Sequence, residues 1–126
     1  MVFIRKEGKF LLGVESKESP IKGQWRLLGG KVDENETLEM AVHREISEEA
    51  GISVKIIKHL GERKAYTWKD HKPLTVHIYL SDQMQGQPIP KLNEIGELKY
   101  FSLEESIGLD LDNISRSAFD EYKSII

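Results

Sequence analysis

The stretch of sequence that decides the fold is residues 30–52, which reads GKVDENETLEMAVHREISEEAGI. Its second part, residues 37–50, has the pattern of a helix: Thr37 is a suitable N-cap, and Gly51 follows at the usual position of a helix-ending glycine. At about 100° per residue, the apolar side chains gather on one side of this helix, which should face the core. They are Leu38, Ala41, Val42, Ile46 and Ala50.

Three glutamates of this helix occupy positions that are usually unfavourable for a negative charge. Glu45 and Glu49 fall inside the apolar arc and Glu48 at its edge, although an unpaired charge is costly to bury. Glu45 and Glu49 also repel each other at positions i and i+4, and all three lie near the helix C-terminus, where the dipole disfavours negative charge. A divalent cation would remove these conflicts, and all-oxygen ligation favours Mg²⁺ or Mn²⁺. The alternative is a solvated acidic face without metal.

The sequence on either side of this helix alternates between strand and helix patterns. A Gly-containing turn joins two apolar runs into a predicted hairpin, and Ser102 begins a capping box. The predicted strands are residues 2–4, 10–14, 25–28, 53–60, 63–68, 74–80 and 98–101, and the predicted loops are residues 15–24 and 83–96. A terminal helix is expected over residues 114–125. This interleaving predicts the α/β (α+β) class with a mixed sheet.

Composition narrows the class of protein further. The chain has 126 residues, of which 39% are hydrophobic and 31% charged, so we expect a single soluble domain over residues 1–126. No apolar run approaches the roughly 18–20 residues of a membrane helix, and no signal peptide is evident, which favours a cytoplasmic protein that does not bind membranes. The absence of cysteine excludes disulfides and thiol catalysis. The net charge of −3, with scattered basic residues, argues against a nucleic-acid polymer as partner.

Residues 30–52 also resemble the Nudix box: Gly, five residues, Glu, seven residues, Arg-Glu, an aliphatic residue, any residue, Glu-Glu, any residue, Gly and an aliphatic residue. Every specified position is matched, by Gly30, Glu36, Arg44, Glu45, Ile46, Glu48, Glu49, Gly51 and Ile52. The resemblance implies an α/β/α sandwich around a mixed β-sheet. It also implies a MutT-like hydrolase that needs Mg²⁺ or Mn²⁺. A shared fold does not by itself fix function, because some Nudix-like domains are regulators or isomerases.

The resemblance assigns roles to individual residues. Glu48 would be the general base, and Lys31 would lie close to a substrate phosphate. Arg44, counted with the catalytic residues, would pair with Glu36 and hold the loop against the helix. The implied metal ligands are one backbone carbonyl and three carboxylates: Gly30, Glu45, Glu48 and Glu49.

A later acidic pair, Glu94 and Glu97, resembles a family position that assists metal binding or acts as a base. Both lie near a Gly- and Pro-containing loop that would suit a movable lid, and the alternative is exposed loop acids. Asn113 is a candidate for reading the base, with an N-cap role as its alternative. Aromatic candidates for stacking on the base, each with sheet packing as the alternative, are Phe3, Tyr66, Trp68, His77 and Tyr79.

Two positions depart from the family pattern. Leu28 stands where the family commonly has proline, and residues 13–15 read Gly-Val-Glu where many MutT-type members carry arginines. The second departure gives no support to the phosphate contacts that such arginines make.

The reaction implied by the resemblance is hydrolysis of a phosphoanhydride bond in a nucleoside diphosphate linked to another moiety. We favour a nucleoside triphosphate, modified or not, cleaved to a nucleoside monophosphate and pyrophosphate. The alternative substrates are ADP-ribose and dinucleoside polyphosphates. A rival of another class is a non-catalytic Nudix-like nucleotide-binding module, which the full set of box carboxylates disfavours. Small members of the family are often dimers, so a homodimer is also compatible with the resemblance.

Overall fold

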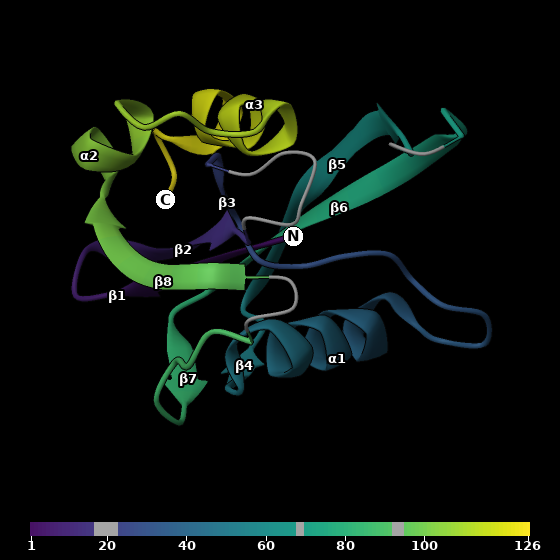
Figure 1. Ribbon diagram of the computed structural model, residues 1–126, viewed down its shortest axis with the longest axis horizontal. Coiled ribbons are helices and arrows are strands. Elements are labelled where there is room, and N and C mark those ends of the chain that lie inside the picture. The colour runs from purple at the N-terminus through teal and green to yellow at the C-terminus, as the bar shows by residue number, and fades with distance from the viewer. Residues whose placement is uncertain (17–22, 68–69, 92–94) are drawn as a thin grey trace.

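The computed structural model describes residues 1–16, 23–67, 70–91 and 95–126 (Figure 1). The predicted sites at Trp68 and Glu94 therefore lie outside the described residues. The elements follow each other as β1 Val2–Lys6, β2 Lys9–Glu15, β3 Trp25–Arg26, α1 Leu38–Ala50, β4 Ser53–Lys55, β5 Lys58–Tyr66, β6 Pro73–Ser81, β7 Gln83–Gln85, β8 Ile95–Ser102, α2 Leu103–Ile107 and α3 Asn113–Tyr122.

The main sheet is mixed, as the sequence predicted. Its strand order is β3-β2-β1-β6-β5, and β8 pairs with β2. β1 is parallel to β6, whereas the β1–β2, β2–β3, β2–β8 and β5–β6 pairs are antiparallel. In Figure 1, α1 lies on one side of this sheet and α2 and α3 on the other, which confirms the α/β/α arrangement. Within the described part of the chain, none of the helices has the length and hydrophobicity needed to span a bilayer.

The sheet has an apolar core on each of its two faces, because successive strand residues point to opposite faces. On β1, Val2 and Ile4 pack with the buried side of α1, whereas Phe3 packs toward α3. The rings of Phe3, Phe10 and Phe119 meet edge to face, with centroids 5.0–5.8 Å apart. Phe3 has no exposed surface, so the alternative of sheet packing is correct for this residue.

Helix α1 is closed at both ends by the residues that the sequence indicated. The Thr37 side chain accepts a hydrogen bond from the Met40 N–H, and Gly51 adopts the left-handed conformation at φ 68°. Ala41, Val42, Ile46 and Ala50 are buried together with Glu49. Leu38 is an exception to the prediction, because 39% of it is exposed.

The predicted strand boundaries in residues 53–68 are wrong in one respect. The break falls at residues 56–57 and not near Gly61, so the short β4 pairs with β7, inside the predicted loop. Strand β5 instead continues through an irregularity beside Gly61, where any side chain would collide with the Tyr122 hydroxyl. Gly61 therefore reflects a close approach between β5 and α3, and not a turn.

The C-terminal part differs from the predictions at two boundaries. β8 begins at Ile95 rather than at residue 98, because its pairing with β2 starts before the expected first residue. The capping box at Ser102 is confirmed. The terminal helix is capped by Asp112, whose side chain accepts from the Ser115 N–H, so the N-cap role suggested for Asn113 is wrong.

Candidate active site

The loop before α1 touches the helix at Gly30 and Glu45. A Cβ added to Gly30 would lie 2.5 Å from Cδ of Glu45, so the carboxylate occupies the space that glycine leaves free. The preceding Gly29 has φ 136°, a conformation that residues with side chains rarely adopt. Leu28, at the family's proline position, is fully buried, and its carbonyl accepts from the Val2 N–H at 2.9 Å. Core packing thus holds the turn without a proline.

Arg44 is the centre of an ionic cluster that ties the loop to the helix. Its Nε donates to Glu36 Oε2 at 2.7 Å, and its Nη2 donates to the Lys31 carbonyl at 2.8 Å. Its Nη1 donates both to Glu45 Oε1 at 2.8 Å and to Glu48 Oε2 at 3.2 Å. The predicted Arg44–Glu36 pair is therefore present.

These contacts shift the pKa values of the pair in opposite directions. Hydrogen bonds from Arg44 and from the Asp33 N–H lower the pKa of the Glu36 carboxyl. Hydrogen bonds to Glu36 and then to Glu45 raise the pKa of Arg44. Both groups are consequently charged at neutral pH.

A second arginine, Arg26, forms a buried cluster that the sequence analysis missed. Its guanidinium pairs with Glu15 and with Glu49, and it also donates to the Leu27 carbonyl at 3.0 Å. The other oxygen of Glu49 accepts from the Gly29 N–H at 2.7 Å. The sequence did contain a signal for this cluster, namely an arginine within the short apolar stretch before Gly29. A buried guanidinium requires carboxylate partners, so Arg26 could have predicted a buried ion pair.

Burial and ion pairing oppose each other in this second cluster, and the outcome differs between its two members. Burial raises the pKa of the Glu49 carboxyl, while Arg26 and the Gly29 N–H act in the opposite direction. For Arg26, burial alone would lower the pKa, but the charges and hydrogen bonds of Glu49 and Glu15 outweigh it and raise the value.

The three box glutamates do not converge as the helical pattern suggested. Glu49 is 1% exposed and turned toward Arg26, whereas the Glu48 side chain is about half exposed. Among the residues described, no three carboxylate or histidine side chains come close enough together to hold a metal ion. Glu45 and Glu48 nevertheless share one guanidinium nitrogen, so a cation already lies between them. Two adjacent carboxylates beside the Gly30 backbone form a hard-oxygen donor set that fits Mg²⁺ or Mn²⁺.

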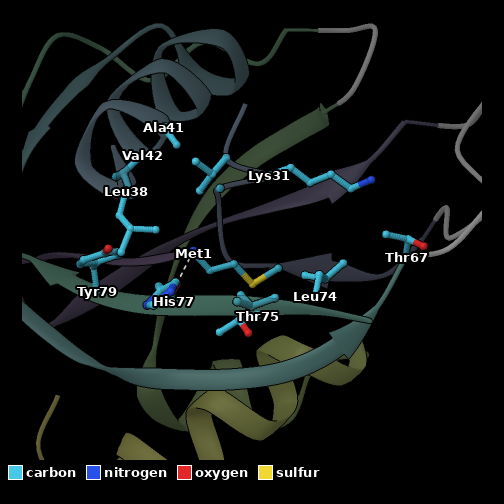
Figure 2. A pocket seen from close by; sticks show the side chains of 14 residues that line it. Met1, Lys31, Leu38, Ala41, Val42, Thr67, Leu74, Thr75, His77 and Tyr79 are labelled. Atoms are coloured by element: carbon cyan, nitrogen blue, oxygen red, sulfur yellow. Dashed lines mark hydrogen bonds between the residues drawn. The ribbon is translucent and has the colours of Figure 1, made fainter. Parts of the chain in front are cut away.

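Two cavities near the sheet contain the predicted substrate-binding residues, but in separate places. The first cavity, of about 390 Å³, lies between α1 and β6, and Lys31 extends along it (Figure 2). His77 and Tyr79 line the same space. The second cavity, of about 420 Å³, lies between β5 and the start of α3 and is lined by Tyr66 and Asn113.

The remaining candidates, Glu97 and Tyr66, are exposed. Glu97 is exposed within β8, opposite Val14, and its role as a metal ligand or base stays a prediction. Tyr66 is 62% exposed and stacks on His71 with the two rings 7° from parallel.

Comparison with known proteins identifies the family. Residues 1–122 match the NUDIX domain model. The chain therefore belongs to the Nudix family, whose hydrolases generally need divalent metal ions and act on small-molecule nucleotides.

The names of the similar proteins give different substrates. The ADP-ribose pyrophosphatase of Methanocaldococcus jannaschii is 34% identical over 125 residues, which are 97% of this chain and 66% of that protein. The oxidized purine nucleoside triphosphate hydrolase of Danio rerio is 34% identical over 88 residues, which are 70% of this chain and 56% of that protein. The chain thus spans less than two thirds of the length of either relative.

Among solved structures, the MutT Nudix hydrolase from Burkholderia pseudomallei superposes with a TM-score of 0.83 and 30% sequence identity. The match covers 94% of this chain and 92% of that one.

Proposed function

We propose that this chain is a Nudix hydrolase that uses Mg²⁺ or Mn²⁺ to cut a phosphoanhydride bond in a small nucleotide. The observation that carries the proposal is the packing of Glu45 against Gly30, beside the half-exposed Glu48 and next to a cavity that Lys31 enters. These groups combine oxygen ligands, an accessible carboxylate and the cationic side chain of Lys31 within one loop and one helix.

The metal would be held by the Gly30 carbonyl, Glu45 and Glu48. When bound, a divalent cation polarises phosphoryl oxygens and makes a water molecule more acidic. A role for Glu49 as a third ligand would require the metal to reach its buried carboxylate, which is turned toward Arg26 and accepts from the Gly29 N–H. In the arrangement described, Glu49 instead fixes the Gly29 N–H and thereby the turn that presents Gly30.

The other residues position groups and move a proton. Glu48 is the best-placed base, because its only hydrogen-bond partner in the described residues is Arg44 and the rest of its carboxylate faces solvent. It would accept the proton of the water that attacks phosphorus, while the bond to the bridging oxygen breaks and that oxygen leaves with its electron pair. Lys31 would bind a phosphate oxygen, and Arg44 would orient both Glu45 and Glu48.

A nucleoside triphosphate is the substrate that we favour, with a nucleoside monophosphate and pyrophosphate as products. The relative named as an oxidized purine nucleoside triphosphate hydrolase supports this choice. A second candidate is ADP-ribose, because the relative named as an ADP-ribose pyrophosphatase aligns over nearly the whole of this chain.

A substrate panel in ¹⁸O-labelled water tests the proposal. Nucleoside triphosphates, ADP-ribose, nucleotide sugars and dinucleoside polyphosphates would each be incubated with the purified chain and Mg²⁺. We expect cleavage of a triphosphate, with ¹⁸O in the monophosphate if water attacks the α-phosphorus and in pyrophosphate if it attacks the β-phosphorus. Binding of nucleotides without turnover of any of them would favour the non-catalytic alternative.

A further inference from the structure

The cavity between α1 and β6 has two chemically different walls (Figure 2). The wall formed by α1 is apolar and consists of Leu38, Ala41 and Val42. The opposite wall is formed by β6, where His77 and Tyr79 lie on the same face because they are two residues apart. A ligand between these walls would meet aliphatic groups on the helix side. On the other side it would meet the rings of His77 and Tyr79 together with Met1, Leu74 and Val76.

The rings of the sheet wall are already held in place. His77 Nδ1 lies 3.1 Å from His59 Nε2, and the two ring centroids are 5.2 Å apart. The ring centroid of Tyr79 lies 5.1 Å from that of His59. His59 thus restrains the rings of His77 and Tyr79, which line the cavity, so less conformational entropy is lost when a ligand packs against them.

The size and lining of the cavity favour a flat heteroaromatic ring over a sugar. Its volume of about 390 Å³ falls within the usual range for small-ligand sites. A sugar presents several hydroxyl groups, and burying them against Leu38, Ala41 and Val42 would leave hydrogen bonds unmade. A heteroaromatic ring needs partners only at its edge. Thr75 lines the cavity, and its hydroxyl, which accepts a hydrogen bond from Lys64, keeps its own hydrogen for donation.

The cavity is continuous with the proposed site of hydrolysis. Gly29, Gly30 and Lys31 line it, and Gly30 is in contact with Glu45. A ligand with its ring between α1 and β6 can thus extend its phosphates past Lys31 toward Gly30. The second cavity contains Tyr66 and Asn113, but none of its lining residues belongs to residues 30–52.

We propose that the cavity between α1 and β6 binds the nucleobase of the substrate, between Leu38 on the helix and His77 and Tyr79 on the sheet. This inference rests on the proposed function, because it takes the ligand to be a nucleotide. In this proposal the base is not recognised by Asn113. Its binding site lies on the opposite face of the sheet and includes the first turn of α1.

Paired substitutions on the first turn of α1 test the helix wall. Leu38 and Met40 are both large, exposed apolar residues, 39% and 55% exposed, but only Leu38 lines the cavity. Leu38→Asn and Met40→Asn therefore introduce the same chemistry with the same helix-propensity cost. His77→Ala tests the opposite wall, and Asn113→Ala tests the second cavity.

The readout is the affinity for a nucleoside monophosphate and, separately, for pyrophosphate, measured by calorimetry without metal so that no turnover occurs. We expect Leu38→Asn and His77→Ala to weaken monophosphate binding about tenfold, because each removes apolar or stacking contact with the ring. Pyrophosphate binding should be unchanged, and Met40→Asn should bind both ligands as the unaltered chain does.

Equal monophosphate affinity in Leu38→Asn and Met40→Asn would overturn the inference, as would a loss confined to Asn113→Ala. Each of these results can be obtained whether or not the chain hydrolyses a nucleotide. A chain that binds a monophosphate through Leu38 but turns over none of the panel would contradict the proposed hydrolysis and leave the cavity assignment standing.

Discussion

Two arginines organise the acidic residues of this chain, and their surroundings are opposite. Arg26 is 8% exposed and pairs with Glu15 and Glu49 inside the protein. Arg44 is partly exposed and pairs at the surface of α1 with Glu36, Glu45 and Glu48. Both are charge-neutralising contacts, yet only the second leaves carboxylate oxygens open to a ligand.

This difference separates a folding role from a chemical one. Removing one partner of a buried ion pair leaves an uncompensated charge in a poorly solvated place, which is strongly destabilising. Exposed pairs contribute little to stability because water and salt screen them. We therefore expect changes at the Arg26 cluster to alter folding, and changes at the Arg44 cluster to alter metal binding and turnover.

The largest effect is expected for Glu48→Gln. This substitution removes the proposed base but keeps the size of the side chain, so kcat should fall by about 10²–10⁴-fold. The melting temperature should stay close to that of the unaltered chain, because Glu48 is half exposed and its pair with Arg44 is 3.2 Å long. Kinetics on the best substrate of the panel, with the exposed loop variant Glu34→Gln as control, would measure this. A kcat within a few-fold of the original would remove Glu48 from the mechanism.

Arg26→Met should give the largest loss of stability. It leaves Glu49 buried without its guanidinium partner, and we expect the free energy of unfolding to fall by about 3–5 kcal/mol. Arg63→Met is a matched control, because the Arg63–Glu121 pair is more exposed and its loss should cost at most about 1 kcal/mol. Urea denaturation measures both variants. Equal losses would mean that burial does not distinguish the two pairs.

Gly30→Ala should act on the metal and not on the fold. The new Cβ would overlap the Glu45 carboxylate, which is the flexible end of a side chain and can move away. We expect Mn²⁺ affinity to fall about 10–100-fold, as when a group that orients a metal ligand is lost. Gly108→Ala is the control, since a Cβ there meets only backbone oxygens at 3.5 Å or more. Unchanged Mn²⁺ affinity in Gly30→Ala would contradict the role of this contact.

The smallest effect concerns acid stability through Glu36. Arg44 lowers the pKa of this carboxyl below its ordinary value of 4.5. The interaction therefore stabilises the fold above that value, and the stabilisation is lost as pH falls through the lower folded-state pKa. Glu36→Gln should lower the melting temperature at pH 7 and have less effect at pH 3. If the difference in melting temperature between Glu36→Gln and the unaltered chain became larger as the pH fell, the result would contradict this account.

Residues 30–52 could be interpreted from sequence because local rules apply there. The N-cap Thr37 and the terminal Gly51 follow from spacing along one loop and one helix, and the Arg44–Glu36 pair was implied by the resemblance to the Nudix box. The two apolar runs of β1 and β2, joined by a Gly-containing turn, likewise predicted the hairpin that these strands form. Local pattern was sufficient wherever the interacting residues are close in the chain.

Contacts between distant segments were not predictable in the same way. Gly61 looked like a break between strands, but the Tyr122 hydroxyl, far along the chain, is what requires a glycine there. The inward orientation of Glu49 depends on Arg26, which lies 23 residues earlier. The helical pattern correctly located Glu49 on the buried side, but it could not indicate that an arginine would neutralise it there.

Mn²⁺ titration followed by electron paramagnetic resonance tests the central claim most directly, because it counts bound metal without requiring a substrate. The claim is that Glu45 and Glu48, beside Gly30, bind a divalent cation. We expect the unaltered chain to bind Mn²⁺, and Glu45→Gln and Glu48→Gln each to weaken that binding at least about tenfold while remaining folded. If both variants bound Mn²⁺ as tightly as the unaltered chain, the metal site would not be at these residues.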